Sequence, residues 1–243
     1  MDWEPIDAAD LVRTHGHHLV DLSAATPDAP VAACPGWTTT DLAVHTATVH
    51  RRVAAICDER ATTPPTSPGP DAPSDDPFAW CHDAVDIVAD ALVGIGADEP
   101  VWTWTDRHDG GFYHRRMIHE TVVHRWDAET AVGAPAEIDP IIAADGIDEL
   151  MSVGMRFRSS GVPIDYPSGS VALLATDTGH RWSLVAVEGV LGVGRDDAAI
   201  TATDATLTGR AAALLLSLWG RGGDDAEPRG DAAVAAAWCA VAP

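Results

Sequence analysis

The hydrophobic periodicity of the chain changes once, near residue 136, and this change limits the possible folds more than any other feature. Before it, apolar residues recur at steps of three and four, the period of a helix that buries one face. After it, runs of alternating apolar and polar residues indicate strands. A chain of 243 residues is long enough for two ordinary domains. We therefore expect two domains, residues 1–136 and residues 137–243.

Four helices are expected in the first domain. The strongest follows the motif CPGW, where Thr38 and Asp41 have the spacing of a capping box. Residues 62–77 are rich in Pro, Ser and Asp and predict an extended loop, whereas residues 101–114 predict an extended segment or a short hairpin. The expected helices cover about residues 7–25, 38–60, 78–96 and 115–129. Together they are enough for an all-α four-helix bundle.

The second domain is expected to be a small α+β domain with an antiparallel sheet. A helix is predicted from about Ile141 to Phe157, and three β-like runs follow: SVALLAT, RWSLVAVEG and AAITATDATLTG. The first two runs are joined by the turn DTGH. Two further helices are expected around AAALLLSLWG and DAAVAAAWCAV. Strands and helices that are segregated in this way are typical of the α+β class.

The charge of the chain argues for small-molecule partners. A formal net charge of −22 opposes binding to nucleic acid or to an anionic membrane, because both require clustered positive charge. All 15 basic residues are Arg, so a lysine Schiff base or a lysine base is excluded. The use of Arg in place of Lys, with abundant Ala, Gly, Asp and Pro, is typical of a GC-rich genome such as that of an actinobacterium.

The compartment predicted from the sequence is the cytoplasm. The N-terminal segment is acidic and has no apolar signal region, and no stretch approaches the roughly 20 apolar residues that span a bilayer. The four cysteines are scattered without CxxC spacing, so we expect them to be reduced and mostly buried. The sequence predicts no particular oligomeric state.

Two of the predicted helices carry residues that can bind metal where a buried face is expected. His45 falls within an apolar stripe of the second helix, and Glu120 and His124 are four residues apart on the fourth. Two imidazoles and a carboxylate form a facial set of ligands that leaves a position open for water or substrate. Such a set suits Zn²⁺ best, with Ni²⁺, Fe²⁺ or Mn²⁺ as alternatives.

A structural interpretation of the same residues stays open at this point. A Glu and a His at this spacing also form solvated surface pairs, and a single His on a buried face is also found as a hydrogen-bonded core residue. The spacing is not that of the HExxH motif, because three residues separate Glu120 from His124 and His119 points elsewhere.

Two segments resemble the signature segments of the mycothiol-dependent maleylpyruvate isomerase family. These are CPGWTTTDLAVHTATVHRR and HETVVHRWDAE. The resemblance implies a DinB-like four-helix bundle that binds a divalent metal through His45, Glu120 and His124. It also implies a C-terminal domain similar to sterol carrier proteins, because ATLTGRAAALLLSLWGR resembles a late strand and helix of that fold.

The function that the resemblance implies is activation of a low-molecular-weight thiol, mycothiol, by the metal. A bound thiol is held as the thiolate, which attacks an electrophile. In an isomerase the thiolate adds to a conjugated double bond and is later eliminated, whereas a thiol S-transferase keeps the thioether. The alternative from another class is a non-catalytic module that binds a structural metal or an apolar ligand.

Other residues are candidates for supporting roles. Arg52 and Arg116 can face the same cavity and hold a substrate carboxylate, although surface arginines are the commoner outcome. Asp127 can orient a ligand or a water molecule, or it can be an exposed residue near a helix end. His17, His18 and His50 are left out of the site, the first two being interpreted as exposed. Arg210 and Arg221 are of interest if the second domain closes over the metal.

Overall fold

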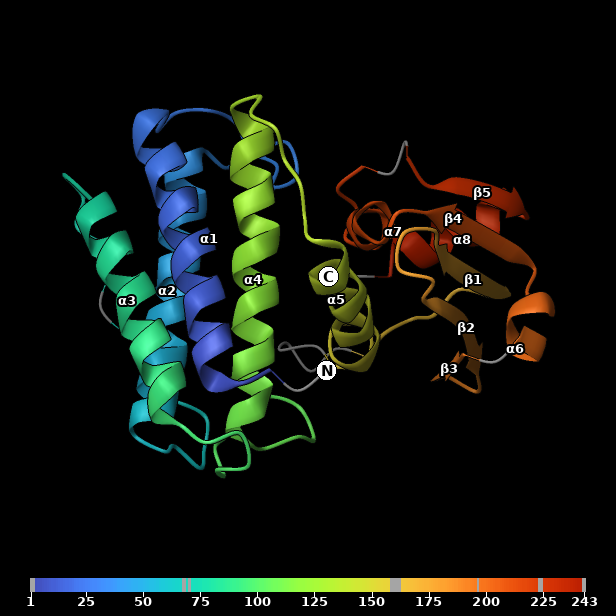
Figure 1. Cartoon of the computed structure of the whole chain (residues 1–243), viewed down its shortest axis with the longest axis horizontal. Coiled ribbons are helices and arrows are strands. Elements are labelled where there is room, and N and C mark those ends of the chain that lie inside the picture. Colours follow the sequence, from blue (N-terminus) through green and yellow to red (C-terminus); the bar gives the residue numbers. More distant parts are fainter. Residues whose placement is uncertain are drawn as a thin grey trace. The chain divides into compact units, whose positions relative to one another are not determined.

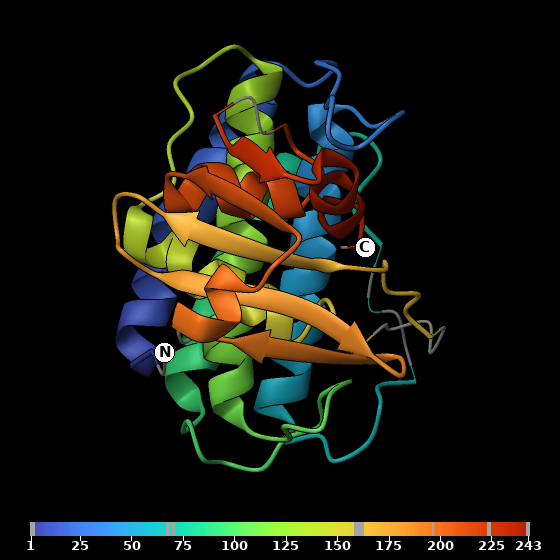
Figure 2. The same ribbon diagram turned by 90° about the vertical axis from the view of Figure 1, so that its right-hand side faces the viewer.

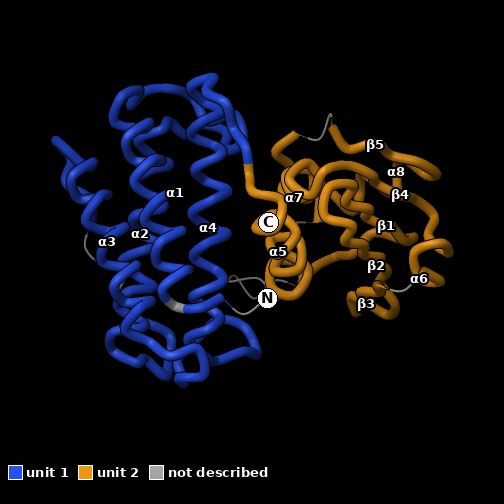
Figure 3. Tube along the Cα trace, in the orientation of Figure 1, with its two compact units in different colours: residues 1–137 blue, residues 138–243 orange. Residues whose placement is uncertain are grey.

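The computed structural model describes residues 3–66, 69, 71–157, 163–195, 197–222 and 225–241. The chain divides into two compact units, Met1–Glu137 and Ile138–Pro243 (Figure 3). None of the helices that the structure describes is long and apolar enough to cross a membrane.

Unit 1 is the expected four-helix bundle (Figure 1). Its long helices are α1 (Pro5–Ala25), α2 (Thr39–Asp58), α3 (Phe78–Gly94) and α4 (Gly110–Ala131). Helix α1 packs against α3 and α4, and α2 packs along α3. The core between them is closed by small and branched side chains, among them Leu19, Leu42, Ala84 and Val85.

The capping box predicted at the start of α2 is present. The side chain of Thr38 accepts a hydrogen bond from the backbone N–H of Asp41, and the Asp41 carboxylate accepts one from the backbone N–H of Thr38. These bonds satisfy backbone groups that would otherwise be unpaired in the first turn. They fix where the helix begins, and hence which residues it presents to the bundle.

The prediction that residues 101–114 are extended is wrong for the last part of that segment. Helix α4 begins at Gly110, because the Asp109 side chain caps it by accepting from the backbone N–H of Phe112 at 3.0 Å. Gly110 is required there, since a Cβ at this position would lie 2.3 Å from the carbonyl oxygen of Gly96. Residues 100 and 109 form a single isolated bridge in place of a hairpin.

Unit 2 contains a five-stranded sheet in the order β3-β2-β1-β4-β5. The strands are β1 (Ser170–Ala175), β2 (Arg181–Val187), β3 (Val190–Gly194), β4 (Ala205–Gly209) and β5 (Glu227–Gly230). Every neighbouring pair is antiparallel except β1 and β4, which are parallel, so the expected antiparallel sheet is in fact mostly antiparallel. Figure 2 shows β1 to β4 lying side by side.

The helices of unit 2 are α5 (Pro140–Ser152), α6 (Asp197–Thr201), α7 (Ala211–Leu218) and α8 (Ala232–Cys239). Helices α7 and α8 pack on β1 and β4, and the side chains of Trp182 and Trp238 are completely buried. The predicted strand over residues 198–209 is wrong in its first half, which forms α6. Apolar and polar residues alternate there over too short a distance to distinguish a strand from a single helical turn.

Candidate metal centre

The three candidate ligands lie together in unit 1. The Nε2 atoms of His45 and His124 lie 3.5 Å and 3.4 Å from the same carboxylate oxygen of Glu120. One ligand atom from each residue falls within 4.8 Å of the other two. The imidazole rings of His45 and His124 meet edge to face, with their centroids 5.2 Å apart. Helix α2 therefore supplies one donor and α4 supplies two.

The site lies at the border between the buried and exposed faces of its helices. The side chains of Glu120 and His124 are 11% and 12% exposed, but that of His45 is 39% exposed. The expectation that His45 lies within the buried face is therefore wrong. The fully buried stripe of α2 passes through Ala43, Ala47 and His50, so His45 stands at its edge. The group is consequently open to solvent on the His45 side. There the imidazole ring of His45 packs against the indole of Trp37, with the ring centroids 4.9 Å apart.

Asp127 fixes the orientation of the His124 ring. Its Oδ2 lies 3.0 Å from His124 Nδ1, and the Asp127 side chain is completely buried. A proton held on Nδ1 by this carboxylate leaves the lone pair of Nε2 directed at Glu120 and His45. Histidines that bind metal are commonly held in this way by a carboxylate on the other ring nitrogen.

The electrostatics of the group favour a bound cation. Burial disfavours the imidazolium form of His124, but hydrogen bonds to Asp127 and Glu120 outweigh it and raise the pKa of His124 to about 9. Burial also opposes ionisation of Glu120, yet Arg116 and the two histidines hold the pKa of Glu120 well below its usual value. Two carboxylates thus stabilise positive charge where the ligand atoms meet, and two imidazole nitrogens with one carboxylate oxygen fit a divalent transition metal.

The two arginine candidates occupy different positions. Arg116 is largely buried, and its Nη2 donates to Glu120 Oε2, the carboxylate oxygen that does not face the histidines. Arg52, on α2, is exposed. The structure therefore brings Arg116 into contact with a candidate ligand and leaves Arg52 at the surface, on the same edge of α2 as His45.

His50 is buried next to the site, although the sequence pattern did not predict it as a site residue. Its side chain is completely inaccessible, and its Nε2 lies 2.9 Å from the hydroxyl of Thr121 on α4. Burial lowers the pKa of His50 to about 4, so the ring is neutral at pH 7. Its position in the buried stripe, five residues after His45, was the available signal. His18 is exposed as expected, whereas His17 is only about one-third exposed.

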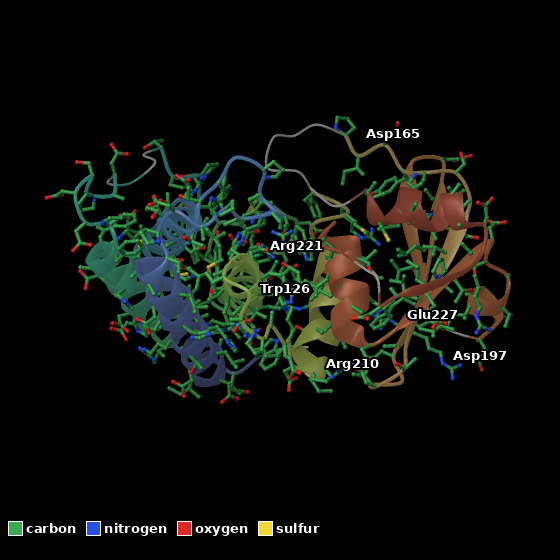
Figure 4. All side chains as sticks on the ribbon, turned by 90° about the horizontal axis from the view of Figure 1, so that it is seen from above. Trp126, Asp165, Asp197, Arg210, Arg221 and Glu227 are labelled. Atoms are coloured by element: carbon green, nitrogen blue, oxygen red, sulfur yellow. The ribbon has the colours of Figure 1, made fainter. Side chains whose placement is uncertain are left out.

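The arginines of interest in the second domain belong to unit 2 and flank α7, Arg210 as its N-cap and Arg221 three residues after its last residue (Figure 4). Arg210 lies 3.6 Å from a carboxylate oxygen of Asp177. The guanidinium of Arg221 lies over the ring of Trp219, 5.6 Å from its centroid. Both arginines therefore have partners within their own unit.

Comparison with known proteins identifies relatives of unit 1 and of the whole fold. Residues 8–129 match the family model described as the mycothiol maleylpyruvate isomerase N-terminal domain. A crystal structure of a mutant of the mycothiol-dependent maleylpyruvate isomerase is similar over 95% of each chain, with a TM-score of 0.65 and 18% identity. A second crystal structure of that enzyme has a TM-score of 0.55 and 17% identity, again over 95% of each chain. No curated protein matches the chain by sequence.

Proposed function

The chain belongs to the mycothiol maleylpyruvate isomerase family, and from this premise we propose that it is a metal-dependent enzyme that uses a low-molecular-weight thiol, mycothiol, to attack a small electrophile. The observation that carries the proposal is the convergence of His45, Glu120 and His124 at a position that is open on one side. Membership of the family supports the use of mycothiol as the thiol. The set of donor atoms supports the binding of a divalent metal. We further propose that the protein acts in the cytoplasm.

The metal we propose is Zn²⁺, with Ni²⁺, Fe²⁺ and Mn²⁺ as alternatives, because the donors alone discriminate poorly among these ions. When bound, such an ion acts as a Lewis acid that favours the thiolate form of a thiol at neutral pH. The ligands would be Nε2 of His45, Nε2 of His124 and one oxygen of Glu120. Asp127 would keep the proton of His124 on Nδ1, and Arg116 would neutralise the second oxygen of Glu120.

We propose that the thiol comes from outside the protein. Burial raises the pKa of the Cys57 and Cys81 thiols to about 12, so neither is a nucleophile at pH 7. Cys34 is partly buried and packs against the hydrophobic core of the bundle. A small thiol that enters on the exposed side of His45 avoids this limitation.

The reaction we favour is isomerisation, in which the sulfur adds to a conjugated double bond, the former double bond rotates, and elimination returns the free thiol and the trans isomer. Thiol S-transfer is the close alternative, because it begins with the same thiolate and stops at the thioether. A non-catalytic structural metal site is less well supported, since a structural ion is normally enclosed by four protein ligands, whereas this group offers three and is open beside His45.

The test compares two assays on the purified protein. With mycothiol present, turnover of maleylpyruvate supports isomerisation, and consumption of a chromogenic electrophile without isomerisation supports S-transfer. Glu120→Ala is expected to abolish either activity while the thermal transition of the protein is largely retained. His18→Ala, which alters an exposed histidine outside the group, is the matched control. Full thiol-dependent activity in Glu120→Ala would overturn the assignment of the site, and a loss of stability with no activity in any variant would favour the structural metal.

A further inference from the structure

A second pair of histidines, His17 and His82, lies between α1 and α3. Each helix carries a His followed four residues later by an Asp: His17 and Asp21 on α1, and His82 and Asp86 on α3. The two pairs cross over. His17 Nε2 lies 3.1 Å from Asp86 Oδ1, and His82 Nε2 lies 3.3 Å from Asp21 Oδ1. Each imidazole therefore has the carboxylate of the other helix at its Nε2 atom.

The remaining nitrogens of the two rings face each other. His17 Nδ1 lies 2.8 Å from His82 Nδ1, and the rings are stacked with centroids 5.1 Å apart. A nitrogen that faces a carboxylate carries the hydrogen, and a neutral imidazole carries only one. If both rings are neutral, two bare lone pairs therefore point at one another across 2.8 Å. A metal ion between the two Nδ1 atoms would replace this repulsion with two favourable bonds.

The backbone holds the two helices close enough for this contact. Gly16, the neighbour of His17, lies against Val85 of α3, and a Cβ at Gly16 would be 2.8 Å from Val85 Cγ2. Glycine destabilises the interior of a helix. Its presence at position 16 is therefore explained by the close approach of α1 and α3. The proximity of the two histidines thus follows from the packing of the helices.

The surroundings of the pair also suit a metal ion. A carboxylate on the second nitrogen of each ring is the arrangement that orients histidines toward metals in proteins. The side chains of His17 and His82 are 34% and 35% exposed, so an ion can reach them and retain water ligands. Arg13 lies 3.9 Å from Asp86 and forms a closer pair with Asp90, which leaves the carboxylate of Asp21 to balance the charge of an ion.

We propose that His17 and His82 form a second binding site for a divalent transition metal such as Zn²⁺, separate from the group on α2 and α4. The protein ligands are the two Nδ1 atoms, and water completes the coordination. Because a Zn–N bond is about 2.0–2.1 Å long, the two nitrogens must move apart from 2.8 Å to about 3.3 Å when a tetrahedral ion binds between them. That movement is within the freedom of side chains that are about one-third exposed.

Metal counting after dialysis against buffered free Zn²⁺ tests the proposal. His82→Ala is expected to bind one ion per chain fewer than the unaltered protein, and so is Glu120→Ala, which removes a ligand of the other site. The combined variant should lose both ions, and His18→Ala, next to His17 on the same helix, should lose none. If His82→Ala retains as many ions as the unaltered protein, the second site does not exist. If Glu120→Ala retains all its ions while His82→Ala loses one, the result counts against the proposed function and leaves the second site intact.

A second variant guards against an effect on folding. His82→Gln can still donate to Asp21 but is a poor ligand for Zn²⁺, so it should keep the fold and lose the ion. Zn²⁺ is expected to raise the melting temperature of Glu120→Ala, since an ion that binds the folded state stabilises it, and this rise should vanish when His82→Gln is added. A rise that is unchanged in the combined variant, or that Mg²⁺ produces equally, would indicate general binding to surface carboxylates and overturn the proposal.

Discussion

The buried carboxylate of Asp127 lies 3.0 Å from Nδ1 of His124, whereas the other ring nitrogen of His124, Nε2, faces Glu120 and His45. The residues are three apart on α4, so one helical turn supplies both the candidate ligand and the group that orients it. The metal affinity of the site should therefore depend on Asp127, although Asp127 is not itself a candidate ligand.

Replacing Asp127 by Asn should weaken metal binding without unfolding the protein. The amide is nearly the same size, but it lacks the charge that favours a proton on Nδ1, so the Nε2 lone pair is no longer fixed. A loss of about 10- to 100-fold in affinity for Zn²⁺ is expected, as for other carboxylates that support a histidine ligand. Competition with a chromogenic chelator measures this loss. Unchanged affinity in Asp127→Asn would show that the carboxylate has no role in orienting His124.

Metal affinity should rise with pH. The pKa of His124 is about 9 in the metal-free protein, because its contacts with Asp127 and Glu120 outweigh the opposing effect of burial. Below pH 9 an ion must displace a proton from this ring, so the apparent affinity should increase by about tenfold per pH unit up to that point and then level off. Proton release during Zn²⁺ titration, measured in buffers of different ionisation enthalpy, checks the stoichiometry. A flat profile between pH 7 and 9 would contradict the raised pKa.

The free energy of unfolding of the metal-free protein should decrease as the pH rises. A folded-state pKa of about 9 for His124 lies above its ordinary value of 6.5, so the folded chain binds more protons than the unfolded chain in that interval. The contribution of this residue is complete below pH 6.5 and is lost as the pH rises through about 9. Urea unfolding of the chelator-treated protein at pH 6.5 and 9 measures it, with His124→Gln as the control in which this part of the pH dependence should disappear.

Gly16→Ala should destabilise unit 1. The added methyl group would lie 2.8 Å from Val85 Cγ2, and overpacking of this kind costs about 1–3 kcal/mol. The better helix propensity of Ala offsets at most about 1 kcal/mol of that cost. Gly94→Ala is the matched control, because a Cβ at the end of α3 meets nothing within 4 Å. Urea denaturation should show a lower midpoint for Gly16→Ala alone, and Val85→Ala in the same chain should restore part of it.

Much of the bundle could be predicted from local patterns, whereas contacts between helices could not. Helical periodicity and the Thr38 capping box predicted α2, and the four-residue spacing placed Glu120 and His124 on one side of α4. Periodicity gives the direction of a side chain only to within the width of a face, so the exposure of His45 was not predicted. The pairing of His17 with His82 depends on the register of α1 against α3, to which no local pattern refers.

The second domain was harder to predict because its strands are short. The strands β3 and β5 have five and four residues and carry no sustained alternation, so neither was predicted. The parallel pairing of β1 with β4 arises because the chain passes through β2, β3 and α6 before it returns to the sheet. Such a crossover is a property of topology, and a hairpin signal such as DTGH indicates only which consecutive strands are neighbours.

The two arginines near the site should respond differently to replacement by Met. Arg116 donates to the second oxygen of Glu120 and helps to hold the pKa of Glu120 low against burial, so in Arg116→Met a proton should compete with the ion for this carboxylate and lower metal affinity. Arg52 is exposed on the same edge of α2 as His45 and is not one of the candidate ligands, so Arg52→Met should leave metal content unchanged and raise KM for a substrate that carries a carboxylate. Metal analysis and steady-state kinetics on both variants separate the two roles. If Arg116→Met keeps its metal and only KM rises, Arg116 holds the substrate and does not support Glu120.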